Sequence, residues 1–186
     1  MSARLPSNWT IFLGAIAAGV LAVVGAFGWF QHGRVPVHGL VEGLAISEQL
    51  RPSSMTWLAG HGYGKVIDMR PDDEAADEPG SAEMGAAAHE RHLRFSYIPV
   101  PHGDIPESAV QALEKALADD NGGTVLLYCR SGRRAARTWS LAEASRPGGL
   151  DVQEILEKVA RAGQSADDLR ADIERRIRAR PVQKTP

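Results

Sequence analysis

Short apolar runs alternate with longer amphipathic stretches along most of the chain. The short runs, each bounded by glycine, proline or polar residues, predict strands near residues 44–47, 65–70, 95–100 and 124–129. The amphipathic stretches predict helices near residues 51–59, 81–92, 107–120, 151–161 and 165–177, and one that begins at about residue 133. This alternation predicts an α/β fold: a mostly parallel central sheet with helices on both faces.

The first hydrophobic stretch differs from the others because it is long and uncharged. Residues 11–30 carry no charge, and such a helix would span roughly 30 Å, the thickness of a bilayer core. Trp9, Trp29 and Phe30 stand at its ends, as interfacial aromatics do. The stretch therefore predicts an uncleaved transmembrane anchor. The alternative is a signal peptide cleaved near Val24-Gly-Ala26.

The anchor divides the chain into segments. They are an N-terminal tail at 1–10, the anchor at 11–30, a linker at 31–40, one globular domain at 41–178 and a loose tail at 179–186. Positive charges on the two sides of the anchor nearly balance, with Arg4 and the terminal amine against Arg34. The short leading tail favours a cytoplasmic N-terminus with the domain outside.

Composition excludes several classes of function. A formal net charge of -2 gives no electrostatic case for nucleic-acid binding, and a single cysteine excludes an internal disulfide framework. The acidic stretch at residues 72–78 is interpreted as a solvated connection, and His89 and His92 as surface residues, because neither has clear metal-ligand spacing. We predict no metal and no cofactor.

The lone Cys129 stands where a predicted strand hands over to a predicted helix, next to Arg130, Arg133 and Arg134. The first amides of a helix have no internal partners, and Gly132 allows a tight turn that points several of them at one oxyanion. Arg134 can add a two-pronged contact to phosphate or sulfate. The same positive field would stabilise a thiolate. The alternative is a buried core cysteine.

Four separated motifs, in order, resemble a bacterial family. They are Arg70-Pro-Asp72, Glu78-Pro-Gly-Ser-Ala-Glu-Met84, Ile98-Pro-Val-Pro101 and Tyr128-Cys-Arg-Ser-Gly132. The family is described both as the beta-lactamase-hydrolase-like phosphatase domain and as a proposed sulfurtransferase. It is related to cysteine-dependent dual-specificity and tyrosine phosphatases, and the resemblance covers about residues 41–178. A bacterial source would place the anchor in the inner membrane, spanning it once, with the domain in the periplasm.

The resemblance implies a tyrosine-phosphatase-like fold, a phosphorylated protein or small molecule as substrate, and a mechanism. Cys129 would attack phosphorus and form a thiophosphate intermediate. Arg134 and the loop residues Arg130, Ser131, Gly132 and Arg133 would hold the phosphate oxygens. Asp104 is the candidate general acid, with His102 as the alternative.

The chain also departs from that pattern. Phosphatases of the superfamily carry one more residue between cysteine and arginine than the four found here, and a Ser or Thr where this chain has Ala135. Tyr128 stands where they commonly have His. The short loop is similar to that of rhodaneses, which carry a persulfide on the cysteine. A sulfurtransferase and a catalytically silent phospho-group-binding module therefore stay open as alternatives.

Overall fold

The structure is a computed structural model that describes residues 35–119 and 122–181. Its strands are β1 (Val37–Val41), β2 (Leu44–Ser47), β3 (Tyr63–Asp68), β4 (Arg94–Tyr97) and β5 (Thr124–Tyr128). Its α-helices are α2 (Ser54–Gly60), α3 (Ser81–Glu90), α4 (Glu107–Ala118), α5 (Arg133–Ser145), α6 (Val152–Arg161) and α7 (Arg170–Arg178). A short 3-10 turn, Asp167–Leu169, precedes α7.

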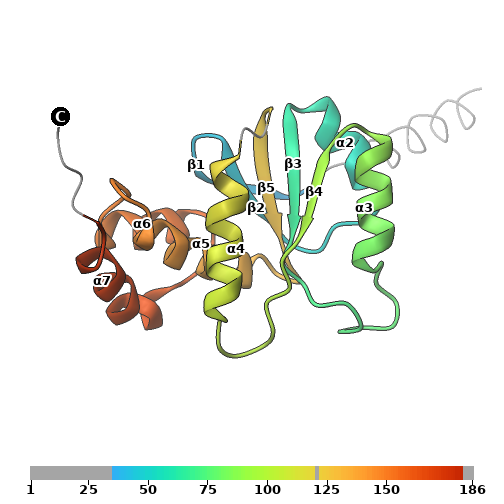
Figure 1. Ribbon diagram of the computed structural model, residues 1–186. Coiled ribbons are helices and arrows are strands. Elements are labelled where there is room, and N and C mark those ends of the chain that lie inside the picture. Colours follow the sequence, from blue (N-terminus) through green and yellow to red (C-terminus); the bar gives the residue numbers. More distant parts are fainter. Residues whose placement is uncertain (1–34, 120–121, 182–186) are drawn as a thin grey trace, which may run out of the picture. The chain divides into compact units, whose positions relative to one another are not determined.

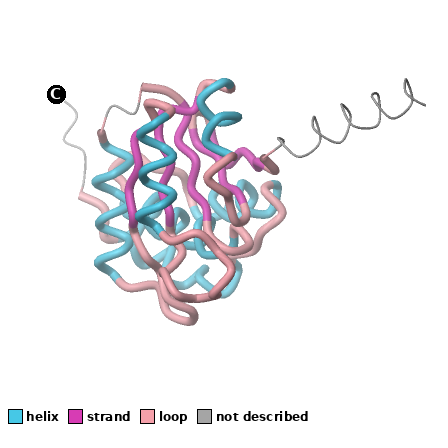
Figure 2. Tube along the Cα trace, turned by 90° about the vertical axis from the view of Figure 1, so that its right-hand side faces the viewer, coloured by secondary structure: helices cyan, strands magenta, loops and turns pink. Residues whose placement is uncertain are grey.

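The strands form one mixed sheet in the order β1-β2-β5-β3-β4 (Figure 1). The pairs β2–β5, β5–β3 and β3–β4 are parallel, whereas β1 runs antiparallel to β2. β5 is the central strand, and its Val125, Leu126 and Leu127 are buried, as the apolar run predicted. Because the carboxyl ends of parallel strands lie at the same end of the sheet, the segments that follow β3, β4 and β5 lie close to one another. Figure 2 shows long loops gathered at that end of the strands.

Helices cover both faces of the sheet, as predicted. One core cluster joins α4, α5, α6 and α7 to side chains such as Ile67 and Leu127. The other joins α2 and α3 to side chains such as Val66 and Leu126. Successive strand residues point to opposite faces, so neighbours in sequence enter different clusters. In Figure 1 the two sets of helices lie on opposite sides of the strands.

Strand β1 was not predicted from the sequence. β1 occupies Val37–Val41, most of which the sequence analysis assigned to a linker, and the buried Val35 already belongs to the second core cluster. Pro36 and Gly39 suggested a connection. β1 is an edge strand paired on one side only, and its register shifts between Gly39 and Val41, so these residues are tolerated there.

Two helix starts differ in the side chain that binds their first amides. Asp151 caps α6 in a capping box: its Oδ1 accepts from the amide of Glu154 at 2.8 Å, and Glu154 Oε2 accepts from the amide of Asp151 at 3.0 Å. Ser81 does not cap α3, because it is the first helical residue. Its amide instead donates to Asp72 Oδ1 at 2.6 Å, so an acidic side chain from the preceding loop holds that helix start.

The predicted anchor at residues 11–30 lies outside the described residues. Among the helices of residues 35–119 and 122–181, none is both long enough and apolar enough to span a bilayer.

Candidate active site

Cys129 directly follows the central strand β5, as predicted. Its side chain is buried, with an exposed fraction of 1%. It belongs to the core cluster formed with α4 and α5. The preceding Tyr128 carbonyl accepts a hydrogen bond from the amide of Met69 at 2.9 Å, which continues the pairing with the β3 side of the sheet. The sulfur is therefore almost completely shielded from solvent.

The backbone between Cys129 and α5 points its carbonyls away and keeps its amides unused. The carbonyl of Arg130 accepts from the amide of Gln49 at 3.3 Å, that of Ser131 from Gln164 Nε2 at 2.9 Å, and that of Gly132 from the amide of Ala136 at 3.0 Å. In the described part of the chain, none of the amides of residues 130–134 donates a hydrogen bond.

Gly132 makes this turn possible. It is the residue before the first turn of α5 and has φ 79° and ψ -16°, a left-handed conformation that favours glycine. A Cβ there would also lie 3.3 Å from Gln164 Nε2 and 3.5 Å from the carbonyl of Ser47. The result is a row of amide donors at a helix N-terminus, an arrangement suited to an anion. We call residues 129–134 the cysteine loop.

Arg134, in the first turn of α5, joins this loop to two other segments. Its Nη1 donates to the carbonyl of Val100 at 2.8 Å. Its guanidinium also interacts electrostatically with Cys129 and forms an ion pair with Glu74. Burial works against its charge, yet the contacts with Glu74 and Cys129 outweigh it, so the pKa of Arg134 is raised. The guanidinium therefore lies beside the sulfur.

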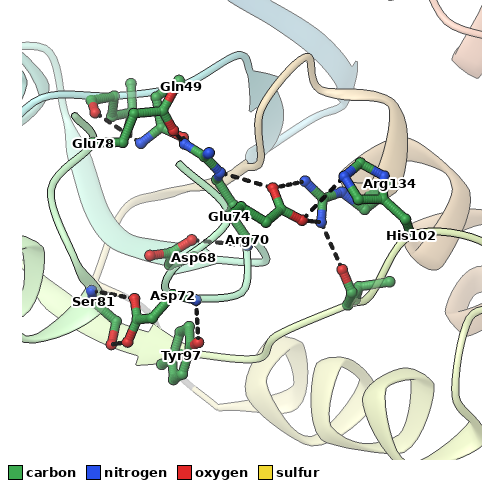
Figure 3. A network of polar contacts seen from close by, with 12 residues as sticks. Gln49, Asp68, Arg70, Asp72, Glu74, Glu78, Ser81, Tyr97, His102 and Arg134 are labelled. Carbon is green, nitrogen blue, oxygen red and sulfur yellow. Dashed lines mark hydrogen bonds and ion pairs between the residues drawn. The ribbon is translucent and has the colours of Figure 1, made fainter. Parts of the chain in front are cut away.

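Glu74 contacts Arg134 through both carboxylate oxygens (Figure 3). Oε1 accepts from Nη1 at 2.5 Å and Oε2 from Nη2 at 2.8 Å, the two-pronged geometry of strong arginine–carboxylate pairs. Oε2 also accepts from Nε of Arg70 at 2.8 Å. The hydrogen bond with Arg134, opposed by burial and supported by Arg70, lowers the pKa of Glu74 to about 2. Glu74 is thus a carboxylate at every physiological pH.

Arg70 is the second arginine of this network, and its exposed fraction is 5%. Its Nη1 donates to Gln49 Oε1 at 2.9 Å and also pairs with Glu78, while its amide donates to Asp68 Oδ1 at 2.9 Å. The backbone amide of Gln49 donates to the carbonyl of Arg130, so this one glutamine contacts both Arg70 and the cysteine loop.

The two candidate general acids lie on the same loop but differ in their contacts. Asp104 is exposed, and it makes no hydrogen bond or ion pair with any residue in the described ranges. His102 has 71% of its side chain exposed, and its Nε2 lies 3.3 Å from Glu74 Oε1. The structure therefore links Cys129, Arg134 and His102 through the Arg134–Glu74 pair, whereas Asp104 has no such contact among the described residues.

Tyr128 points away from the cysteine loop. It is fully buried in the core cluster formed with α2 and α3, and it is the register partner of Asp68 on β3. Burial raises the pKa of Asp68 to about 6, although the neighbouring Tyr128 and the hydrogen bond from the Arg70 amide act to lower it. Burial and the Asp68 charge raise the pKa of Tyr128. Tyr128 is therefore a neutral phenol in the core cluster opposite the one that contains Cys129.

Glu74 gives the acidic stretch a role that its sequence did not predict. The sequence predicts a solvated connection at residues 72–78, yet Glu74 has only 13% of its side chain exposed and pairs with two arginines. The available signal was the position of Arg70 and Glu74 just after a buried strand. A carboxylate in such a place lies close to the residues that follow the neighbouring parallel strands.

The substrate-binding residues predicted on the cysteine loop divide by exposure. Gly132 is buried, while Arg130, Ser131 and Arg133 have exposed side chains. Their backbone amides, rather than their side chains, are the groups that the loop conformation brings together.

Comparison with known proteins places this geometry in context. Over 102 residues the chain is 37% identical to the beta-lactamase hydrolase-like protein of Xylella fastidiosa, which is 55% of this chain but 23% of the relative. A protein from Neisseria meningitidis described as a candidate phosphatase has a TM-score of 0.64 and 28% identity, covering 75% of this chain and 96% of that one. Tk-PTP in its active form has a TM-score of 0.61 and 16% identity, covering 78% of this chain and 97% of that one, which shows a shared fold.

Residues 37–146, more than half of the chain, match a single family, and they include β1 through α5 with the whole cysteine loop. The resemblance that the four sequence motifs predicted is confirmed. The chain belongs to the family described as beta-lactamase hydrolase-like protein, phosphatase-like domain.

Proposed function

We propose that this chain is a cysteine-dependent phosphatase that hydrolyses phosphate monoesters of proteins or small molecules. The observation that carries the proposal is the cysteine loop itself: the amides of residues 130–134 have no partner among the described residues, and Arg134 lies beside the sulfur at their end. A phosphoryl group is highly charged, and its transfer is catalysed mainly by positioning and electrostatic stabilisation. A row of amide donors with one guanidinium supplies both.

In the first step the thiolate of Cys129 attacks phosphorus, and the bond from phosphorus to the leaving oxygen breaks. The amides of residues 130–134 and the guanidinium of Arg134 hold the three other oxygens. An acid from the loop after β4 gives its proton to the leaving oxygen. Asp104 is our candidate, and His102, which contacts Glu74, is the alternative.

In the second step water attacks the thiophosphate, the S–P bond breaks, and phosphate leaves. The thiolate of Cys129 is then restored. The acid of the first step, now deprotonated, accepts a proton from the attacking water. No metal or cofactor takes part in either step.

The test is hydrolysis of an aryl phosphate by the purified full-length chain in detergent, beside Cys129→Ser. The serine is nearly isosteric in this buried position, so the variant should fold while its turnover falls by at least about 10³-fold. Circular dichroism confirms folding. Activity retained in Cys129→Ser would refute the mechanism.

A sulfurtransferase is the alternative that the short cysteine loop favours, and mass spectrometry distinguishes it. We expect that thiosulfate leaves the mass of the chain unchanged. A gain of one sulfur on Cys129, together with no aryl phosphate turnover, would assign the chain to sulfur transfer. Tight binding of a phosphopeptide without turnover would assign it to a silent binding module.

We further propose that residues 11–30 anchor the enzyme in the bacterial inner membrane, with the domain on the periplasmic side. The support is the uncharged stretch of about 20 residues flanked by aromatic side chains. The anchored chain should stay with the membrane after alkaline carbonate washing, and protease added to spheroplasts should digest the domain. Release by carbonate would contradict the anchor.

A further inference from the structure

Four polar side chains form a closed circuit around the cysteine loop. Arg134 pairs with Glu74, and Glu74 accepts from Arg70. Arg70 donates to the Gln49 side chain (Figure 3). The backbone amide of Gln49 binds the carbonyl of Arg130, which closes the circuit at the loop. Glu74 is the member that touches both arginines. It lies 60 residues before Arg134 in the sequence, so the fold, not chain proximity, creates the contact.

Glu74 supports the arginine from behind and does not fill the place of an anion. A carboxylate lying in the anion place would accept hydrogen bonds from the amides of residues 130–134. In the described residues those amides donate nothing to Glu74, which accepts from the two guanidinium groups and lies 3.3 Å from His102 Nε2 through Oε1. The pair uses Nη1 and Nη2 of Arg134, which leaves its Nε–H outside the pair.

Building on the phosphatase function above, we propose that Glu74 is a positioning residue that orients the Arg134 guanidinium toward the phosphoryl group. An arginine side chain has several rotatable bonds, and an unfixed one loses conformational entropy each time it binds an anion. The two-pronged pair, with the Val100 carbonyl as a third contact, fixes the guanidinium before substrate arrives.

Arg70 makes this support durable. It is almost fully buried and donates to the same Glu74 oxygen that receives Nη2 of Arg134. The second arginine offsets the repulsion that a lone carboxylate would exert on an approaching phosphate. Because the pKa of Glu74 is about 2, the carboxylate stays charged throughout the pH range of an assay.

The experiment compares the full-length chain with Glu74→Gln in steady-state aryl phosphate hydrolysis and in inhibition by inorganic phosphate. Glutamine keeps the size of the side chain but cannot accept from two guanidinium nitrogens with both ends. We expect kcat/KM to fall by about 10- to 100-fold and the inhibition constant of phosphate to rise by about tenfold. Glu74→Asp keeps the charge on a shorter side chain and should show a smaller loss of the same kind.

A double-mutant cycle separates positioning from a role in folding. If Glu74 acts through Arg134, Glu74→Gln should cost little in a chain that already carries Arg134→Lys. Glu83→Gln, in an exposed position at the start of α3, serves as the matched control and should keep wild-type kinetics.

Several results would overturn the proposal. Additive losses in the cycle would do so, as would tighter phosphate binding or faster turnover in Glu74→Gln, which would make Glu74 an inhibitory carboxylate. If the wild-type chain turns over no aryl phosphate, the proposed function fails by itself. Calorimetric titration with inorganic phosphate then still decides the positioning role, since equal affinity in wild type and Glu74→Gln would refute it.

Discussion

Two loops at the carboxyl ends of the strands contact Arg134, and they differ in how their side chains are held. The loop after β3, residues 69–80, contributes the Glu74 carboxylate, and the loop after β4, residues 98–106, contributes the Val100 carbonyl. The first is held by charged side chains: Asp72 accepts from both the amide and the hydroxyl of Ser81, and its own amide donates to the Tyr97 hydroxyl at 2.8 Å. The second exposes its polar side chains to solvent.

This difference suits two different tasks. A group that must hold an arginine in one orientation gains from a loop fixed by ion pairs, because its geometry is set before substrate binds. A group that must deliver a proton to leaving groups of various shapes gains from an exposed position at the mouth of the site. The contacts of Glu74 therefore fit positioning, and the exposure of His102 and Asp104 fits proton transfer.

The largest effect should come from removing the group that both loops share. Lysine at position 134 keeps the charge but cannot form the fork that Glu74 receives while also reaching the Val100 carbonyl. We expect Arg134→Lys to lower kcat/KM by about 10²- to 10³-fold and to abolish most inhibition by phosphate. Arg137→Lys, which changes an arginine of α5 that pairs with Asp168, is the control. Wild-type phosphate inhibition in Arg134→Lys would contradict the shared role.

The next effect concerns the exposed loop alone. Asp104→Asn should lower turnover by up to about 10²-fold for phosphate esters with poor leaving groups and much less for activated aryl phosphates, because only poor leaving groups need the proton. The measurement is the slope of log kcat/KM against leaving-group pKa.

His102→Asn is the paired variant for that measurement. A steeper slope in His102→Asn, with an unchanged slope in Asp104→Asn, would transfer the acid role to the histidine beside Glu74. An equal loss for all esters in Asp104→Asn would make Asp104 structural.

The smallest expected effect is on stability, and it arises from Asp68, where the loop after β3 begins. Asp68 ends β3 with an exposed fraction of 3%, and its pKa is raised from 3.8 to about 6, mainly by burial. The folded chain therefore binds the proton more tightly than the unfolded chain. Its contribution to stability is full below about pH 3.8 and is lost as the pH rises through 6. The loss corresponds to about 3 kcal/mol.

Asp68→Asn keeps an oxygen that can accept from the Arg70 amide but cannot ionise. We expect it to flatten the pH dependence of the free energy of unfolding between pH 4.5 and 7, measured by urea titration. Glu74 acts in the opposite direction, because its lowered pKa adds stability above pH 4.5 that is lost toward pH 2. The chosen window therefore avoids the titration of Glu74. An unchanged slope in Asp68→Asn would assign the pH dependence to other groups.

The sequence predicted features that depend on local pattern. The apolar run before Cys129, the tight turn at Gly132 and the helix that begins at about Arg133 are encoded within a few residues, and all three are found in the structure. The family followed from motifs of the same local kind. Edge strand β1 was missed because its Pro36 and Gly39 resemble a connection, and an edge strand carries a weaker hydrophobic pattern.

The contacts of the site were harder to predict because they join distant segments. Glu74 looked like one acidic residue among several, and nothing near it in the sequence announces Arg134. The role of Gln49 could not be predicted for the same reason, because it depends on contacts with both the carbonyl of Arg130 and the guanidinium of Arg70. Hydrophobic periodicity fixes which elements form, whereas a polar circuit depends on how they meet.

The hydrogen bond from Gln164 to the Ser131 carbonyl has a practical consequence for anyone who trims this protein. The family match ends at residue 146, but Gln164 follows α6, beyond that boundary, and Ile155, Val159 and Ile173 from the same C-terminal portion are buried in the main core. A protein expressed only to residue 146 would lose these buried side chains from its core and the Gln164 hydrogen bond from its cysteine loop. Helices α6 and α7 thus belong to the smallest unit worth cloning.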